Sequence, residues 1–164
     1  MKKGLFTLFL ALGAPVMATA PARAQDVPEY VDDRSGAREL IGSYFNALNR
    51  HEFSRAWSYW DGGVPGMDFS AFEFRYAEVT RIRVRLGTTV SEGAVGSIYT
   101  QVPLAIEMQM ESGEARVAAG CFVLRISNPQ IQGVPFKPLH IERGALAQLD
   151  GASLKETVPG PCDF

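Results

Sequence analysis

The segment from residue 37 to residue 60 constrains the fold most, because two short helical patterns stand there on either side of a polar break, Asn49-Arg50-His51. Apolar residues recur at helical spacing on both sides, at Ala37, Leu40, Ile41, Tyr44 and Leu48 before the break and at Phe53, Ala56, Trp57 and Trp60 after it. From Thr80 onward the pattern changes to the alternation that is typical of strands. Helices followed only by strands predict one sheet packed on a few helices, and such an arrangement can enclose a pocket.

The remaining elements follow from capping residues and from alternating apolar side chains. Asp33 or Ser35 can cap the first helix, and Asp68 can cap a third helix that continues to Tyr76. Pro103 lies inside a long strand and has no backbone N–H, so we expect a bulge or an exposed edge there. The predicted order is three helices over about 35–49, 53–60 and 69–76, then antiparallel strands over 81–86, 98–110, 115–126 and 139–149. The predicted fold class is α+β, with one domain over residues 34–150.

The N-terminus has the features of a signal peptide of bacterial type. Lys2 and Lys3 precede an apolar run over residues 5–16, and Ala22-Arg23-Ala24 supplies small residues before a cleavage point. We therefore expect residues 1–24 to be cleaved, residues 25–33 to form a flexible lead-in, and the mature protein to be periplasmic or secreted. The alternative is that the apolar run stays as an anchor. No second long apolar run follows, which predicts a mature chain without an integral membrane segment.

The charge balance argues against nucleic acid as a partner. The whole chain has 16 basic and 18 acidic residues, and removal of Lys2, Lys3 and Arg23 leaves 13 of the 16 basic ones. Three arginines at positions 81, 83 and 85 alternate with apolar residues, which places them on one face of a strand. That face is either simply solvated or an anion-binding stripe.

The two cysteines, Cys121 and Cys162, are expected to pair. Leftover thiols of an exported protein usually form a disulfide, and here the bond would tie the C-terminal tail, residues 151–164, to a strand. The alternatives are two unrelated thiols or a nucleophilic Cys121. The apolar surroundings of Cys121 in the sequence lack the positive charge that activates a thiolate.

The order of elements resembles the nuclear-transport-factor-2-like (NTF2-like) superfamily, also called SnoaL-like. The resemblance rests on the helical hairpin over 44–57, the segment Phe72–Tyr76 that leads into the strands, and Val117–Leu124 leading toward His140. It covers roughly residues 33–149, and among relatives the chain looks most similar to uncharacterised secreted bacterial proteins. The resemblance implies a cone, in which three N-terminal helices pack in the concave face of a strongly curved antiparallel sheet. It also implies frequent homodimers but no single activity, because members include isomerases, dehydratases, epoxide hydrolases and non-catalytic modules.

A pocket enclosed by such a cone would be rich in aromatic side chains, which suit a small apolar ligand. The ligand-pocket candidates are Tyr44, Trp57, Trp60, Tyr76, Tyr99 and His140. Two other interpretations remain open. The rings can simply fill the core, or the outer face of the sheet around Tyr99, Gln101 and Glu107 can bind a protein partner or a second copy of the chain.

An enzyme of the isomerase, dehydratase or hydrolase type would need a pocket carboxylate or histidine beside its tyrosine donors. Glu107 lies on a polar strand face and Asp61 lies in an Asp-Gly-Gly turn, so no acid–base set stands out and we predict no catalytic residue. His51 and His140 are the only histidines and have no paired spacing, so we predict no metal site and no cofactor. The sequence favours a non-catalytic exported protein that binds a small apolar molecule or a protein, with the enzyme as the alternative.

Overall fold

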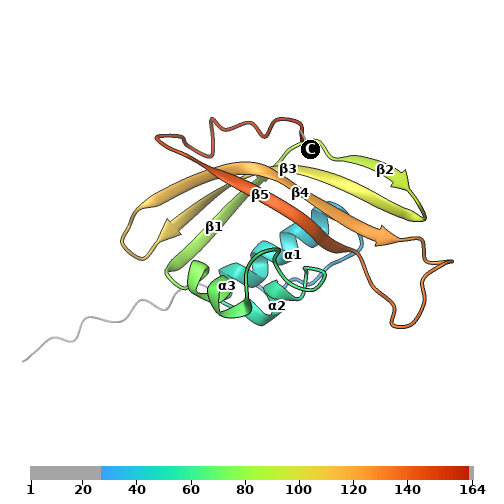
Figure 1. The fold of residues 1–164 in the computed structure, drawn as a ribbon. Helices are drawn as coiled ribbons and strands as arrows, with labels where there is room; N and C mark the ends of the chain where they lie inside the picture. The colour runs from blue at the N-terminus through green and yellow to red at the C-terminus, as the bar shows by residue number, and fades with distance from the viewer. Residues whose placement is uncertain (1–26, 163–164) are drawn as a thin grey trace, which may run out of the picture.

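The computed structural model describes residues 27–162, so the predicted signal peptide lies outside the described residues. Three helices come first, α1 (Ala37–Asn49), α2 (Phe53–Trp57) and α3 (Phe69–Tyr76). Five strands follow, β1 (Val79–Leu86), β2 (Val90–Ala94), β3 (Ser97–Met110), β4 (Ala115–Ser127) and β5 (His140–Leu149). The helices cover one face of a single antiparallel sheet, which confirms the α+β class (Figure 1). Among the described residues, no helix has the length and apolar character needed to cross a membrane.

The helical pattern places its apolar residues in the core, as expected. Leu40, Ile41 and Tyr44 of α1 are buried. The predicted capping of α1 by Asp33 or Ser35 is wrong, since Gly36 is the N-cap and no side chain caps the helix. Asp33 instead accepts the Ser35 N–H at 2.8 Å. The predicted capping of α3 is confirmed, since Asp68 Oδ1 accepts the Ala71 N–H at 2.8 Å.

The second helix ends at Trp57, earlier than the sequence pattern suggests. Residues 59–61 instead run beside the start of β5, where the Ile141 N–H donates to the Tyr59 carbonyl at 2.7 Å. The Asp61 N–H donates to the Ile141 carbonyl at 3.2 Å, and Trp60 and Ile141 form an isolated parallel bridge. We call this contact the Trp60 bridge. At this point α2 ends, and the backbone of residues 59–61 bonds to β5 and so links the helical layer to the sheet.

The strand order is β1-β3-β4-β5, and β2 shares with β1 the same edge of the long strand β3. Pro103 stands opposite the gap between β1 and β2, where its carbonyl accepts the Gly87 N–H at 2.7 Å. At this position no neighbouring strand needs a donor from residue 103, so the proline costs the sheet no hydrogen bond. Of the two expected outcomes at Pro103, a bulge or an exposed edge, the bulge is not found, because the β3–β4 ladder passes Pro103 without a register shift. The edge of β3 that pairs with β1 and β2 is interrupted at this residue.

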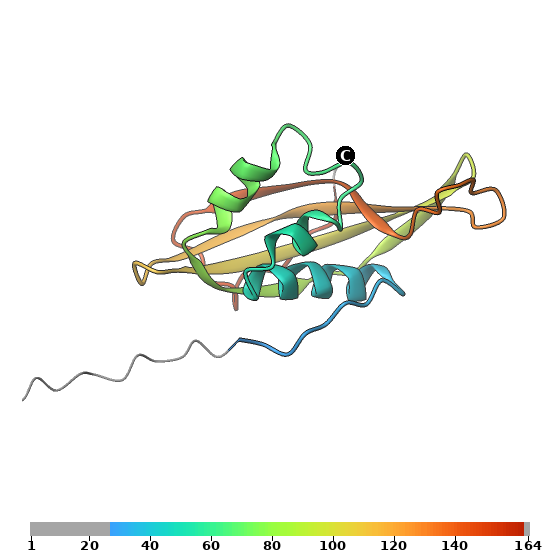
Figure 2. The ribbon, with the colours of Figure 1, turned by 90° about the horizontal axis from the view of Figure 1, so that it is seen from below.

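The sheet arches over the helices but does not curl strongly, so the expected cone is corrected to an open arch (Figure 1). Strong curvature needs repeated bulges or glycine kinks along the strands. The described ladders have register shifts only at Val79/Arg81 and at Val123/Leu124, and the central β3–β4 pair has none. Viewed from below, α1 lies beneath the β1 side of the sheet and α3 lies toward β5 (Figure 2).

The C-terminal tail crosses the face of the sheet that the helices leave uncovered (Figure 1). The predicted disulfide between Cys121 and Cys162 is present, and Arg85 donates to the Lys155 and Thr157 carbonyls at 2.8 and 3.2 Å. A cross-link over 41 residues lowers the entropy of the unfolded chain and is worth about 4 kcal/mol. The tail lies beside Gln101 and Glu107, the residues expected to offer this face to a second copy.

The described part of the lead-in, residues 27–33, has no regular secondary structure but is held by hydrogen bonds. The Tyr59 hydroxyl donates to Asp32 at 2.6 Å, and the Arg55 guanidinium donates to the Val31 carbonyl at 2.7 Å. The Asp33 N–H donates to the buried Ser43 hydroxyl at 2.7 Å. This segment therefore lies against α1 and α2.

Candidate functional site

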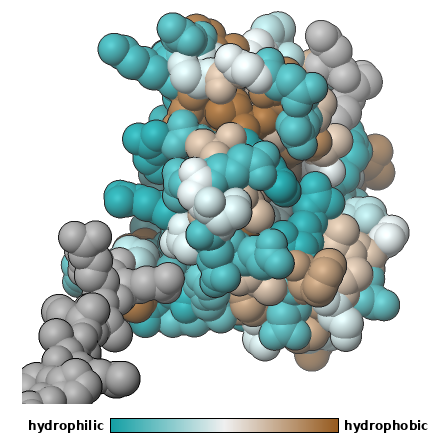
Figure 3. Space-filling model, turned by 90° about the vertical axis from the view of Figure 1, so that its left-hand side faces the viewer, coloured by the Kyte–Doolittle hydropathy of each residue, from teal (hydrophilic) through white to brown (hydrophobic). Residues whose placement is uncertain are grey.

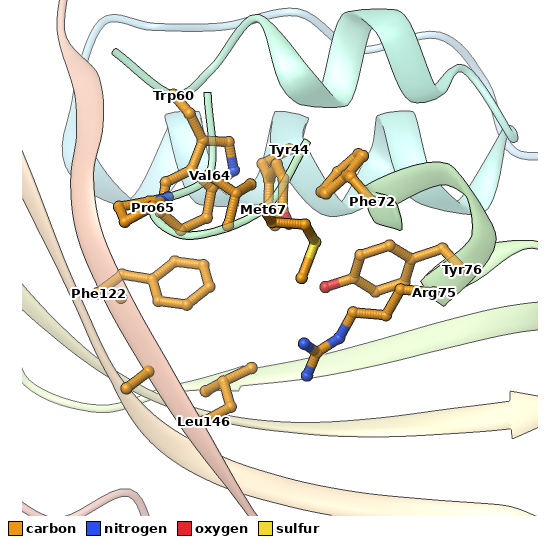
Figure 4. Close-up of a pocket in the computed structure, with 12 residues that line it drawn as sticks. Tyr44, Trp60, Val64, Pro65, Met67, Phe72, Arg75, Tyr76, Phe122 and Leu146 are labelled. Carbon is orange, nitrogen blue, oxygen red and sulfur yellow. The ribbon is translucent and has the colours of Figure 1, made fainter. Parts of the chain in front are cut away.

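A cavity of about 230 Å³ lies between α3, the loop after the Trp60 bridge, and strands β4 and β5. Its lining consists of Tyr44, Trp60, Val64, Pro65, Met67, Phe72, Arg75, Tyr76, Phe122, Gly144, Ala145 and Leu146. The labelled side chains come from α1, α3, the loop and the sheet and converge on one space (Figure 4). Seen from the end of the molecule at which α3 lies, apolar side chains gather between hydrophilic ones (Figure 3).

The inner wall of the cavity is a cluster of aromatic rings in edge-to-face contact. The ring centroids of Trp60 and Phe122 lie 5.5 Å apart, and each lies 6.0 Å from the Tyr44 ring. Phe122 fits because Gly144 stands opposite it on β5, where an added Cβ would lie 2.2 Å from the Phe122 ring. These contacts fix the position of the wall, since edge-to-face pairs favour one geometry over others.

Polar groups enter the cavity from α1 and α3. Figure 4 shows the Tyr76 hydroxyl and the Arg75 guanidinium directed into the space, near Met67. Burial raises the pKa of the Tyr44 hydroxyl well above its ordinary value of 10.0, and the neighbouring Tyr76 raises it further. The nearby Trp60 N–H lowers that pKa somewhat. The Trp60 N–H is itself buried and has no hydrogen-bond partner among the described residues. Tyr44 is therefore a neutral hydroxyl and not a base.

Arg75 is the charged group of the cavity. It is exposed at the end of α3 and forms no ion pair or hydrogen bond with the described residues. Figure 4 shows its guanidinium directed into the cavity, and its positive charge lowers the pKa of Tyr44. A guanidinium without a carboxylate partner beside an apolar cavity is suited to meet an anion.

Three of the six pocket candidates from the sequence, Tyr44, Trp60 and Tyr76, line the cavity. Trp57 lies outside the lining because its ring packs on Gly63, Phe69 and Phe72. Tyr99 points from β3 to the opposite face, near Arg125, whose guanidinium carbon lies 5.7 Å from the ring centroid. His140 begins β5 and faces Asp61 and Glu142 instead of the cavity.

The lining also includes residues that the sequence analysis did not name as pocket residues. Val64, Pro65 and Met67 belong to a glycine-containing loop with no periodicity. Arg75 stands on a short helix whose pattern gives no sign that a cavity lies beside it. Leu146 follows the strand alternation, which places it on a face but does not show that a cavity opens there.

The second polar site is a cluster of three possible metal ligands, Asp61, His140 and Glu142, on the other side of the Trp60 bridge from the cavity. One ligand atom from each residue lies within 4.8 Å of the other two. Lys137 donates to both Asp61 oxygens at 2.9 and 3.0 Å, and this contact lowers the pKa of the Asp61 carboxyl below its ordinary value of 3.8. No metal site was expected here, since the two histidines have no paired spacing in the sequence, and the fold instead joins ligands from two distant segments.

Comparison with known proteins yields likeness of fold only. Neither a protein-family model nor a curated protein sequence matches the chain. A candidate aromatic ring hydroxylase from Novosphingobium aromaticivorans matches 68% of this chain and 90% of its own, at 10% identity and a TM-score of 0.49. A conserved protein from Planctomyces limnophilus matches 68% and 94% of the two chains, at 18% identity and a TM-score of 0.47.

A candidate dehydratase of the NTF2-like family from Streptomyces avermitilis matches 68% of this chain and 93% of its own, at 13% identity and a TM-score of 0.45. The matched structures thus include a member of the family that the sequence resembles. At these identities the likeness describes the arrangement of elements and nothing of activity.

Proposed function

We propose that this protein binds, without chemical conversion, a small apolar molecule that carries one acidic group. The observation that supports this proposal is the aromatic cavity with an unpaired guanidinium beside it. The body of the ligand would contact Trp60, Phe122 and Leu146, and the acidic group would meet Arg75 and the Tyr76 hydroxyl. Small-molecule sites usually have such a mostly apolar wall with a few polar groups that orient the ligand.

The size of the cavity limits the ligand. Its volume of about 230 Å³ is below the range of roughly 300–1,000 Å³ that is common for drug-sized ligands. A molecule of one or two rings, or a short acyl chain, is the class that fits. Longer ligands would have to leave part of their apolar surface in water.

The acidic group would contribute specificity more than affinity. A charge-assisted hydrogen bond is worth about 1.5–3 kcal/mol when it is shielded from water. Arg75 is exposed, so solvent screening reduces this value toward about 1 kcal/mol. We therefore expect an anionic ligand to bind about fivefold more tightly than its uncharged counterpart, because 1.4 kcal/mol corresponds to one factor of ten.

The composition of the lining supports binding over catalysis. Among the described residues that line the cavity, none is an aspartate, a glutamate or a histidine. Proton transfer of the isomerase or dehydratase type needs a base within hydrogen-bond reach of the substrate. His140, the histidine considered for that role, lies outside the lining. The tyrosines alone would supply donors without a base.

Calorimetric titration tests the proposal with three probes of one shape and different charge: naphthoate, naphthylmethanol and naphthylmethylamine. We expect naphthoate to bind most tightly and the amine most weakly. Arg75→Gln should weaken naphthoate binding about fivefold and abolish the preference for the anion. Arg81→Gln removes an exposed arginine of β1 outside the cavity and serves as the matched control. Equal binding by all three probes, or no effect of Arg75→Gln, would contradict the proposal.

We also propose that the protein works in the periplasm or outside the cell. The disulfide supports an oxidising compartment, since cytosolic thiols are kept reduced. Mass spectrometry of the protein recovered from the periplasm of its host should give a chain that begins at Gln25. An intact N-terminus in the cytosolic fraction would contradict this proposal.

A further inference from the structure

At the Trp60 bridge, the neighbouring side chains of Trp60 and Asp61 lie in different environments. Trp60 enters the apolar cavity, whereas Asp61 meets His140 and Glu142 from β5. The backbone hydrogen bonds of Ile141 to Tyr59 and Asp61 hold the two segments together at this point. Backbone hydrogen bonds therefore bring Asp61 close to His140 and Glu142, whatever contacts the three side chains make with one another.

Glu142 reaches the cluster through an irregularity in β5. In the β4–β5 ladder Val123 pairs with Arg143 and Leu124 pairs with Ile141, so Glu142 has no partner on β4. Such a bulge turns a side chain away from regular alternation, and bulges are frequent next to functional sites. The result is that Glu142 Oε2 lies 3.4 Å from His140 Nε2.

His140 is oriented in the way that a metal-ligating histidine requires. It is 6% exposed, and its Nδ1 lies 2.8 Å from the Pro138 carbonyl, which can only accept a hydrogen. The proton of a neutral ring therefore resides on Nδ1, and the lone pair of Nε2 faces Asp61 Oδ2 at 3.7 Å and Glu142 Oε2 at 3.4 Å. This buried Nε2 has no hydrogen-bond partner among the described residues. Two carboxylate oxygens beside this nitrogen favour positive charge between them, which a proton or a bound metal ion can supply.

Two basic side chains also approach the cluster, Lys137 at both oxygens of Asp61 and Arg125 at the Glu142 oxygen that does not face His140. Lys137 binds Asp61, and Arg125 lies 3.7 Å from Glu142 Oε1. Both are long side chains with part of their surface in water, Lys137 more than half. Neither donates a hydrogen bond to Nε2, and the Glu142 oxygen beside that nitrogen is not the one that Arg125 approaches. A metal ion would compete with Lys137 for Asp61.

We propose that Asp61, His140 and Glu142 bind one divalent transition-metal ion, with Zn²⁺ as the best match. An imidazole nitrogen favours Zn²⁺ and other transition-metal ions, and Zn²⁺ also accepts carboxylate oxygens, whereas Ca²⁺ and Mg²⁺ prefer oxygen ligands alone. The Nδ1 hydrogen bond to Pro138 is the outer contact that commonly orients such a histidine. The bound ion would connect the loop after α2 to β5 and so hold Trp60 in the wall of the cavity.

Calorimetric titration of Zn²⁺ into chelator-treated protein without a histidine tag tests this proposal. We expect one equivalent to bind, and Co²⁺ in its place to give the visible absorption of a low-coordinate site. Glu142→Gln should weaken Zn²⁺ binding by more than about tenfold. Glu114→Gln makes the same change at an exposed carboxylate paired with Arg116, and it should leave the affinity unaltered. Lys137→Met should strengthen binding, because it removes a competitor for Asp61.

His140→Ala is the second ligand variant, and circular dichroism verifies that it is folded before titration. Saturable binding of one Zn²⁺ that both Glu142→Gln and His140→Ala weaken supports the site. The absence of saturable binding, or equal affinity in the wild type and Glu142→Gln, would overturn it. The naphthoate titration uses different residues, so failure of either proposal leaves the other to its own result.

Discussion

The aromatic cavity and the Asp61–His140–Glu142 cluster lie on opposite sides of one backbone contact, the Trp60 bridge, yet they are built in different ways. The cavity wall consists of buried rings whose positions are fixed by packing, and Tyr44 and Phe122 are almost completely inaccessible. The cluster consists of partly exposed carboxylates around one buried imidazole, and backbone hydrogen bonds determine its geometry. Changes to the wall should therefore affect stability strongly, and changes to the cluster should affect ion binding with little effect on stability.

The largest expected effect is that of Trp60→Ala, which removes a wall ring 7% exposed to solvent. Truncation of a buried tryptophan costs about 3–5 kcal/mol of unfolding free energy, which urea denaturation measures. Trp60→Phe should cost far less, because it retains a ring and removes an indole N–H that has no partner among the described residues. A loss below about 1 kcal/mol for Trp60→Ala, within the range of ordinary surface changes, would show that the wall is not part of the core.

Gly144→Ala should have an intermediate effect. The added Cβ would lie 2.2 Å from the Phe122 ring, so the ring must move, and such overpacking costs about 1–3 kcal/mol. Naphthoate binding should weaken at the same time, whereas Zn²⁺ affinity should persist because the ligand atoms are not altered. At Gly133 an added Cβ meets nothing within 4 Å, so Gly133→Ala is the matched control. Equal stability of the two variants would refute the tight fit of Phe122.

The smallest effect concerns the Lys137–Asp61 contact. The pKa of Asp61 is lowered in the folded protein, mainly by the hydrogen bond from Lys137. A lowered pKa means that the contact stabilises the fold above the unfolded value of 3.8, and that this contribution is lost as the pH falls through the folded pKa. The pair is partly exposed, so the contribution is below about 1 kcal/mol.

Lys137→Met should raise the pKa of Asp61 toward 3.8, and an NMR titration of its carboxyl carbon in metal-free protein measures the change. Lys155→Met, a change of the same kind on the exposed C-terminal tail, should leave that pKa in place. If both variants gave the wild-type titration curve, the contact would have no electrostatic role.

The wall of the cavity was the more predictable of the two regions. Helical spacing alone places Tyr44 on the buried face of α1, and two cysteines in a chain expected to be exported were enough to predict the disulfide. Arg75 could not be selected, because a basic residue on a short helix is ordinarily a solvated one. The degree of curvature was overestimated, since the sequence does not show how few register shifts the ladders contain.

The cluster could not be predicted from spacing rules. Those rules look for ligands within one helix or strand, whereas Asp61 comes from a loop that joins β5 only through the Trp60 bridge. Glu142 is brought in by a bulge that no residue pattern announces. The bridge forms because α2 ends at Trp57. The sequence did not show this end, because apolar residues keep helical spacing as far as Trp60.

The central claim is that the cavity beside Trp60 binds a small apolar anion, and the indole N–H signals of the two tryptophans test it most directly. Trp60 lines the cavity, whereas Trp57 packs beside it against Phe69 and Phe72. On titration with naphthoate, we predict a saturable NMR shift of the Trp60 indole N–H and a much smaller shift of Trp57. A Trp60 signal that stays in place, or two signals that shift equally without saturation, would contradict the account.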